Sequence, residues 1–148
     1  MSALCFVDTN ILVYSRDASE PQKQPRAREW MAHLWADRRG RISVQILSEY
    51  YVTVTRKLRP GLSRQDAWAD VKALLAWQPV PMDAALIEEG YRQQEAFGLA
   101  WWDALVLTAA QRARCRYLLS EDFQEGQDFA GLVVVNPFRR APADDLSV

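Results

Sequence analysis

The chain has 148 residues, of which 49% are hydrophobic and 25% are charged, and its formal net charge is −1. These values are typical of one folded domain, and the sequence has no repeat, no low-complexity tract and no apolar run of about 18 residues. The first residues lack the basic and apolar segments of a signal peptide, so we expect a cytoplasmic protein without a membrane segment.

The charges are unevenly distributed along the chain. Residues 1–64 contain 11 Lys and Arg against 6 Asp and Glu, whereas residues 65–148 contain 7 against 13, so the two parts carry +5 and −6. A basic face for a polyanion is possible in the first part, although runs such as 38–41 are more often only solvated.

Cysteine and histidine do not indicate a soft metal site. Cys5 lies within an apolar run and Cys115 has no CxxC partner, so we expect two reduced thiols, with Cys5 in the core. The single histidine, His33, is expected on a helix surface, and one histidine excludes a multi-histidine zinc site.

Apolar periodicity predicts strands that alternate with helices, which is typical of a parallel sheet with helices on both faces. Ser63 and Asp83 are expected to cap helices, and Gly98 to end one. We expect strands at residues 4–7, 41–44, 78–82, 116–120 and 132–135, and helices over 11–14, 27–35, 45–58, 64–77, 84–97 and from 101, with a loop over 18–25 and a polar, mobile tail from 139.

The first strand ends in an unusual polar group, Asp8-Thr9-Asn10. A buried strand would deliver Asp8 to the carboxyl edge of the sheet, where ligands bind in open α/β folds. Thr9 or Asn10 is expected to cap the following helix.

Three further acids are expected at the same edge. Asp122 follows another strand, much as Asp8 follows the first, and Glu49 and Asp103 lie in the early turns of helices. Taken alone, Glu49 is better explained as an exposed acid near a helix N-terminus, where the helix dipole favours it.

Four carboxylates in one place require a counter-charge, because each pair at about 4 Å costs on the order of 1 to 4 kcal/mol. With no His or Cys in the set, the oxygen ligands suit a hard divalent ion, Mg²⁺ or Mn²⁺, rather than zinc. Such a site favours hydrolysis of a phosphate ester by a metal-activated water.

The motifs of other enzyme classes are absent from the sequence, including GxSxG, GxxxxGK[ST] and GxGxxG. Two other interpretations stay open. A haloacid-dehalogenase-type phosphatase would need a second Asp where Asn10 stands, and a catalytically silent module would bind RNA or a protein partner through the basic first part.

Four segments together resemble the PIN-domain ribonucleases, especially the VapC-type toxins of toxin-antitoxin pairs. They are Asp8-Thr9-Asn10 after the first strand, residues 42–49, Trp102-Asp103-Ala104 and Ser120-Glu121-Asp122-Phe123. The resemblance runs over residues 4–138, so we expect a PIN domain over 1–138 and a polar tail over 139–148.

The resemblance implies an α/β/α sandwich with a five-stranded parallel sheet and an endoribonuclease that cleaves RNA phosphodiesters with Mg²⁺ or Mn²⁺. It also implies an antitoxin partner and a homodimer, although a PIN nuclease that is not a toxin is an alternative. Asp8, Glu49, Asp103 and Asp122 would hold metal, and Asn10 and Ser120 would orient ligands, although a turn cap and a strand-end hydroxyl explain these two nearly as well. Trp101 and Trp102 are expected to pack rather than to stack on a base.

Overall fold

The computed structural model describes residues 3–144, and within them five strands form one sheet in the order β2-β1-β3-β5-β4. β2, β1, β3 and β5 are parallel. The expected α/β fold is confirmed. The strands are β1 (Cys5–Val7), β2 (Gly40–Arg41), β3 (Tyr117–Leu119), β4 (Asp128–Phe129) and β5 (Leu132–Val135).

The edge strand β4 differs from the expected all-parallel sheet, because it is antiparallel to β5. Only Ala130 and Gly131 connect the two strands, both with positive φ, and so short a connection allows only an antiparallel hairpin. The Asp128 side chain accepts a 2.7 Å hydrogen bond from the Gly131 N–H and closes this turn.

The prediction of a strand at 78–82 is wrong, and the fifth strand of the sheet is β4. Val80 makes a single bridge to Ser43, with hydrogen bonds from the Val80 N–H to the Ile42 carbonyl and from the Val44 N–H to the Val80 carbonyl. Pro79 and Pro81 have no N–H, so the ladder cannot extend past Val80.

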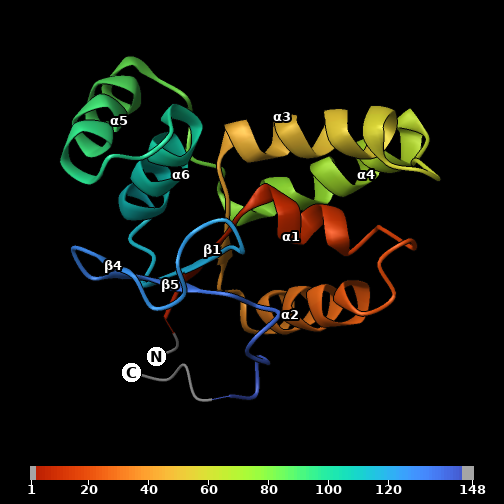
Figure 1. The fold of residues 1–148 in the computed structure, drawn as a ribbon. Helices are drawn as coiled ribbons and strands as arrows, with labels where there is room; N and C mark the ends of the chain where they lie inside the picture. The colour runs from red at the N-terminus through yellow and green to blue at the C-terminus, as the bar shows by residue number, and fades with distance from the viewer. Residues whose placement is uncertain (1–2, 145–148) are drawn as a thin grey trace.

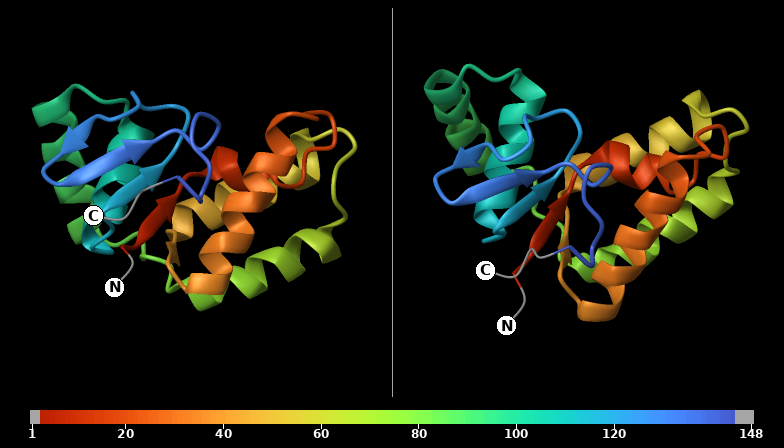
Figure 2. Two further views of the ribbon diagram at one scale, coloured as in Figure 1. Left: turned by 90° about the horizontal axis from the view of Figure 1, so that it is seen from below. Right: turned by 60° about the horizontal axis from the view of Figure 1, so that its bottom comes forward.

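The helices form pairs around the sheet. Figure 1 shows α5 beside α6 and α3 beside α4, and both views of Figure 2 place the strands between α5–α6 and α2. The helices are α1 (Thr9–Tyr14), α2 (Lys23–Asp37), α3 (Val44–Val52), α4 (Arg64–Leu74), α5 (Ala84–Phe97) and α6 (Trp101–Arg112), and the π-turn η1 (Thr53–Lys57) and the 3-10 turn η2 (Leu75–Trp77) continue α3 and α4.

Several helix ends follow the predicted local signals. Ser63 accepts a hydrogen bond from the Asp66 N–H, and Asp83 accepts one from the Leu86 N–H, so both residues cap helices as expected. Gly98 ends α5 with a φ of 64°, the left-handed conformation that glycine adopts without strain.

Other boundaries differ from the prediction. Helix α2 starts within the predicted loop, since Pro25 falls in its first turn, where a missing N–H breaks no helical bond. The strand predicted at 41–44 ends at Arg41, because Ser43 caps α3 through the Ile46 N–H. The helix predicted over 45–58 is divided into α3 and η1.

The core fills both faces of the central strands, with Phe6, Leu118 and Val134 completely buried. Both cysteines are free and buried, as expected. No helix within residues 3–144 has the length and apolar character needed to span a bilayer.

The predicted tail over 139–148 lies partly outside the described residues. Within its described part, the Arg140 carbonyl accepts a 2.9 Å hydrogen bond from Trp30 Nε1, and the Arg140 side chain lies 3.2 Å from Glu125. Arg140 therefore lies against the domain.

Candidate active site

Adjacent parallel strands place Asp8 and Ser120 side by side at the carboxyl edge of the sheet. Val7 of β1 pairs with Leu119 of β3, and each polar residue follows directly. Ser120 is completely buried and its hydroxyl donates a 2.7 Å hydrogen bond to Asp8 Oδ2.

Asp8 also starts the first helix. Its Oδ1 accepts a 2.8 Å hydrogen bond from the Thr9 N–H, so Asp8 itself is the N-cap of α1 and the predicted cap by Thr9 or Asn10 is wrong. The side chain that ends β1 satisfies the first free N–H of the helix, and this fixes the carboxylate in place.

All four predicted acids line one pocket of about 340 Å³. Asp8 comes from the end of β1, Glu49 from α3, Asp103 from the first turn of α6 and Asp122 from the segment after β3. Asp8 is buried and Asp103 half-buried, whereas Glu49 and Asp122 are exposed at the open side.

Neutral side chains hold three of these carboxylates. Besides the bond from Ser120 to Asp8, Asn10 Nδ2 donates to Asp122 Oδ2 at 2.9 Å. Glu49 Oε1 accepts from Thr9 Oγ1 at 3.2 Å and from Gln45 Nε2 at 3.3 Å. Among the described residues, the Asp103 carboxylate has no hydrogen-bond partner.

The pocket has an excess of negative charge. Burial raises the pKa of Asp8 to about 6, the hydrogen bonds from Ser120 and Thr9 oppose this shift, and the charges of Asp122 and Asp103 add to it. Burial, and then Asp122, also raise the pKa of Asp103. Within residues 3–144, no Lys or Arg forms an ion pair with any of the four acids.

Three other acids follow β3, but each is used elsewhere. Glu121 lies 2.8 Å from Lys23 Nζ and accepts a 2.6 Å hydrogen bond from the Tyr14 hydroxyl. Glu125 pairs with Arg140, and Asp128 closes the β4–β5 turn. Asp122 is thus the acid of this segment that faces the pocket.

The donor set fits a hard divalent cation, because every candidate ligand in the pocket is an oxygen. Asn10 Oδ1 and Gln45 Oε1 add two buried amide oxygens that have no hydrogen-bond partner. As the side chains of residues 3–144 lie, no three His, Cys, Asp or Glu groups are arranged around one ion position.

Sequence reasoning missed two side chains of the pocket. Gln45 is buried, at 7% exposure, and lies one helical turn before Glu49, so its spacing to that acid was a usable signal. Trp102 was expected to pack, but it is 59% exposed and lines the pocket beside Asp103. His33 lies in α2 beside Asp37, on the helix surface as predicted.

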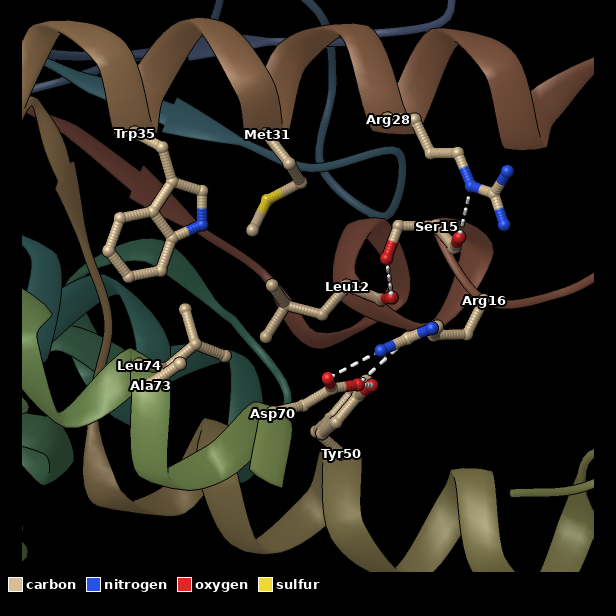
Figure 3. Close-up of a pocket in the computed structure, with 10 residues that line it drawn as sticks. All are labelled: Leu12, Ser15, Arg16, Arg28, Met31, Trp35, Tyr50, Asp70, Ala73 and Leu74. Atoms are coloured by element: carbon tan, nitrogen blue, oxygen red, sulfur yellow. Dashed lines mark hydrogen bonds and ion pairs between the residues drawn. The ribbon is translucent and has the colours of Figure 1, made fainter. Parts of the chain in front are cut away.

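A second cavity, of about 300 Å³, lies between α1, α2, α3 and α4 (Figure 3). Arg16 makes two hydrogen bonds to Asp70, of 2.5 and 2.9 Å, and the Tyr50 hydroxyl donates a 2.5 Å bond to the same carboxylate. The charge of Asp70 is already balanced by Arg16, so this cavity lacks the uncompensated carboxylates of the first pocket.

Three solved structures share the fold. The chain is similar to a toxin-antitoxin complex from Klebsiella pneumoniae (TM-score 0.63, 18% identity, 90% of this chain and 97% of that one). It is also similar to the sarcin-ricin loop cleaving toxin VapC20 of Mycobacterium tuberculosis, with a TM-score of 0.61 and 18% sequence identity over 80% of this chain and 91% of that one. The third is FitAB bound to the IR36 DNA fragment, with a TM-score of 0.68 and 18% sequence identity over 91% of this chain and 96% of that one.

No curated protein sequence matches the chain. The sequence profile of the PIN domain, however, matches residues 5–125. This match includes Asp8, Glu49, Asp103 and Asp122, the four acids of the pocket. The chain therefore belongs to the PIN domain family.

Proposed function

We propose that this protein is a Mg²⁺- or Mn²⁺-dependent endoribonuclease and the toxin of a toxin-antitoxin pair. The observation that carries the proposal is the convergence of four carboxylates, without a protein cation, on one pocket of a PIN-family chain. A site with this charge is stabilised by a divalent ion, and an ion held by carboxylates commonly binds phosphate groups.

Asp8 and Asp103 are the proposed principal metal ligands, since they are the more enclosed acids. Glu49 and Asp122 complete the set at the open side, directly or through water. When bound, the ion supplies Lewis-acid stabilisation of the phosphate and a more acidic water.

The hydrogen-bonding neighbours have positioning roles in this proposal. Ser120 fixes Asp8 from one side and the Thr9 N–H fixes it from the other, so the carboxylate keeps one orientation. Asn10 holds Asp122 in the same way. Such outer contacts of metal ligands typically change affinity or activity by about 10- to 100-fold.

Trp102 supports RNA as the substrate. An indole exposed at the mouth of a charged pocket can stack on an unpaired base, and proteins recognise single-stranded RNA in this way. The basic residues of the first part of the chain would contact phosphates on either side of the cleaved bond.

The partner assignments come from the fold relatives. One is titled a toxin-antitoxin complex and another is VapC20, a toxin that cleaves the sarcin-ricin loop. We propose that a cognate antitoxin protein blocks the carboxylate pocket, that the toxin forms a homodimer, and that it acts in the cytoplasm. The PIN domain is proposed to cover residues 1–138, followed by the polar tail.

The test is to sequence RNA 5′ and 3′ ends after brief expression of the wild type, Asp8→Asn and Asp66→Asn. Asp66 is an exposed acid on α4, so its variant is a matched control. We expect new RNA ends and growth arrest with the wild type and Asp66→Asn but not with Asp8→Asn. Identical RNA ends in all three strains would contradict the proposal.

A further inference from the structure

Gln45 is a buried amide at the edge of the carboxylate pocket. It lies in the first turn of α3, its side chain lines the pocket, and it is only 7% exposed. Its Nε2 donates a 3.3 Å hydrogen bond to Glu49 Oε1, one helical turn further along α3. Its Oε1 is buried and has no hydrogen-bond partner.

The orientation of this amide follows from its neighbour. If the amide turned by half a rotation, Oε1 would face Glu49 Oε1, and two acceptors would meet. The contact with Glu49 therefore keeps the NH₂ group on the carboxylate and leaves the carbonyl oxygen without a donor. A buried acceptor without a donor is unfavourable, so such atoms need an explanation.

Asn10 repeats the same arrangement on a different element. Its Nδ2 donates to Asp122 at 2.9 Å, and its Oδ1 is also buried without a partner. Four side-chain polar atoms of the described residues are buried without a hydrogen-bond partner, two donors and two acceptors, and both acceptors belong to residues of this pocket. The two donors, Arg39 Nε and Trp77 Nε1, belong to residues outside it.

Two buried acceptors beside four carboxylates suit a ligand with two properties. It must neutralise negative charge and must also offer hydrogen-bond donors. Water molecules on a divalent cation meet both requirements, and Mg²⁺ in particular retains several of its waters when carboxylates bind it.

We infer that Gln45 is a positioning residue of the cation site, which orients Glu49 through Nε2 and accepts a hydrogen bond from a cation-bound water at Oε1. This inference rests on the divalent ion of the proposed function. No role was assigned to Gln45 from the sequence.

The alternative is that the amide only holds Glu49 in place. That role depends on the NH₂ donor, whereas the inferred role also needs the oxygen. Gln45→Met removes both groups at nearly constant length and adds no charge. In a Glu49→Ala background the acid that Nε2 holds is gone, so any remaining effect of Gln45→Met on the cation comes from the oxygen, and the two backgrounds separate the two roles.

The experiment is a Mn²⁺ titration of the metal-free protein, followed by electron paramagnetic resonance of the free ion, with no RNA present. We expect Gln45→Met to weaken Mn²⁺ binding by about 10- to 100-fold, and the double variant Glu49→Ala/Gln45→Met to bind more weakly than Glu49→Ala alone. The control is Gln111→Met, because Gln111 is half-buried on α6 and bonds to Gln93 outside the pocket. This variant should bind Mn²⁺ as the wild type does.

Equal affinity of the wild type and Gln45→Met would overturn the inference and leave the metal-dependent function intact. Equal affinity of Glu49→Ala and Glu49→Ala/Gln45→Met would also overturn it. If the wild type bound no Mn²⁺, the metal-dependent function itself would fail, and the inference with it.

A second measurement uses the unaltered protein and does not depend on the folding of a variant. In an NMR titration with Mg²⁺, the side-chain amide signal of Gln45 should shift, while that of Gln111 stays in place. A Gln45 signal that does not move when Mg²⁺ binds would overturn the inference.

Discussion

The two cavities described above have similar volumes, but they differ in whether a protein cation pairs with their carboxylates. In the cavity of Figure 3, Asp70 receives two bonds from Arg16 and one from Tyr50, so its charge is compensated within the protein. In the carboxylate pocket, Asp8 receives bonds from neutral groups alone within residues 3–144, and it lies near Asp103 and Asp122. The difference identifies the pocket whose charge is left for a ligand to neutralise.

The same contrast separates two neighbours in the sequence. Glu121 is paired with Lys23 and Tyr14, whereas Asp122, the next residue, contacts Asn10 and lines the pocket. Being acidic and close to the site is therefore not sufficient for a role as a metal ligand. The absence of a protein counter-ion is the more useful criterion.

The largest effect is expected from removing one charge of the pocket. Asp8→Asn or Asp103→Asn should lower RNA cleavage by about 10³-fold, since a metal ion contributes several kcal/mol of stabilisation to the transition state. The measurement is single-turnover cleavage of a labelled RNA with Mn²⁺. Asp70→Asn should cleave at close to the wild-type rate if folded, and a comparable loss in that variant would remove the distinction between the cavities.

The charge excess should also appear in the pH dependence of stability. The pKa of Asp8 is about 6 in the folded protein and 3.8 ordinarily, so the folded state binds more protons between these values. The free energy of unfolding should therefore fall as the pH rises from about 3 to 7, by about 3 kcal/mol from this residue. The measurement is chemical denaturation at a series of pH values, with EDTA present to remove divalent ions.

Asp8→Asn is the control for this pH effect, because the amide does not titrate. Its stability should fall less than that of the wild type across the same pH range. If the stability of the wild type changed with pH in parallel with that of Asp8→Asn, burial and the neighbouring charges would not raise the pKa of Asp8.

The compensated cavity should respond in stability rather than in cleavage. Asp70→Asn leaves Arg16 without its carboxylate and weakens the bond from Tyr50, so we expect a loss of about 2 kcal/mol, limited by the partial exposure of the ion pair. Urea denaturation at pH 7 tests this. Unchanged stability would mean that the network contributes little to the fold.

The smallest effect is expected at the mouth of the pocket. Trp102→Ala should raise the KM for RNA about fivefold with little change in kcat, because one stacked base contributes on the order of 1 kcal/mol. Trp68→Ala is the matched control, since Trp68 is 53% exposed on α4, outside the pocket. Equal changes in KM for both variants would argue against stacking at Trp102.

Much of the fold was predictable because its signals are local. The apolar run before Asp8, the caps at Ser63 and Asp83 and the glycine after α5 each act within a few residues. The convergence of the four acids also followed, because parallel strands bring their carboxyl ends to one edge.

The remaining features depend on contacts between distant segments. Pro79 and Pro81 were a usable local signal that the segment around Val80 makes only one bridge, but no local signal shows that the two-residue β4 would complete the sheet. The exposure of Trp102 and the burial of Gln45 are set by the packing of α3 and α6 around the pocket, which spacing alone does not determine.

The central claim is that the uncompensated carboxylates around Asp8 bind a divalent cation. The most direct test is the Mn²⁺ titration followed by electron paramagnetic resonance, applied to metal-free wild type, Asp8→Asn and Asp70→Asn. We predict saturable Mn²⁺ binding by the wild type and Asp70→Asn, and its loss in Asp8→Asn. No binding by the wild type, or equal binding by all three proteins, would contradict the claim.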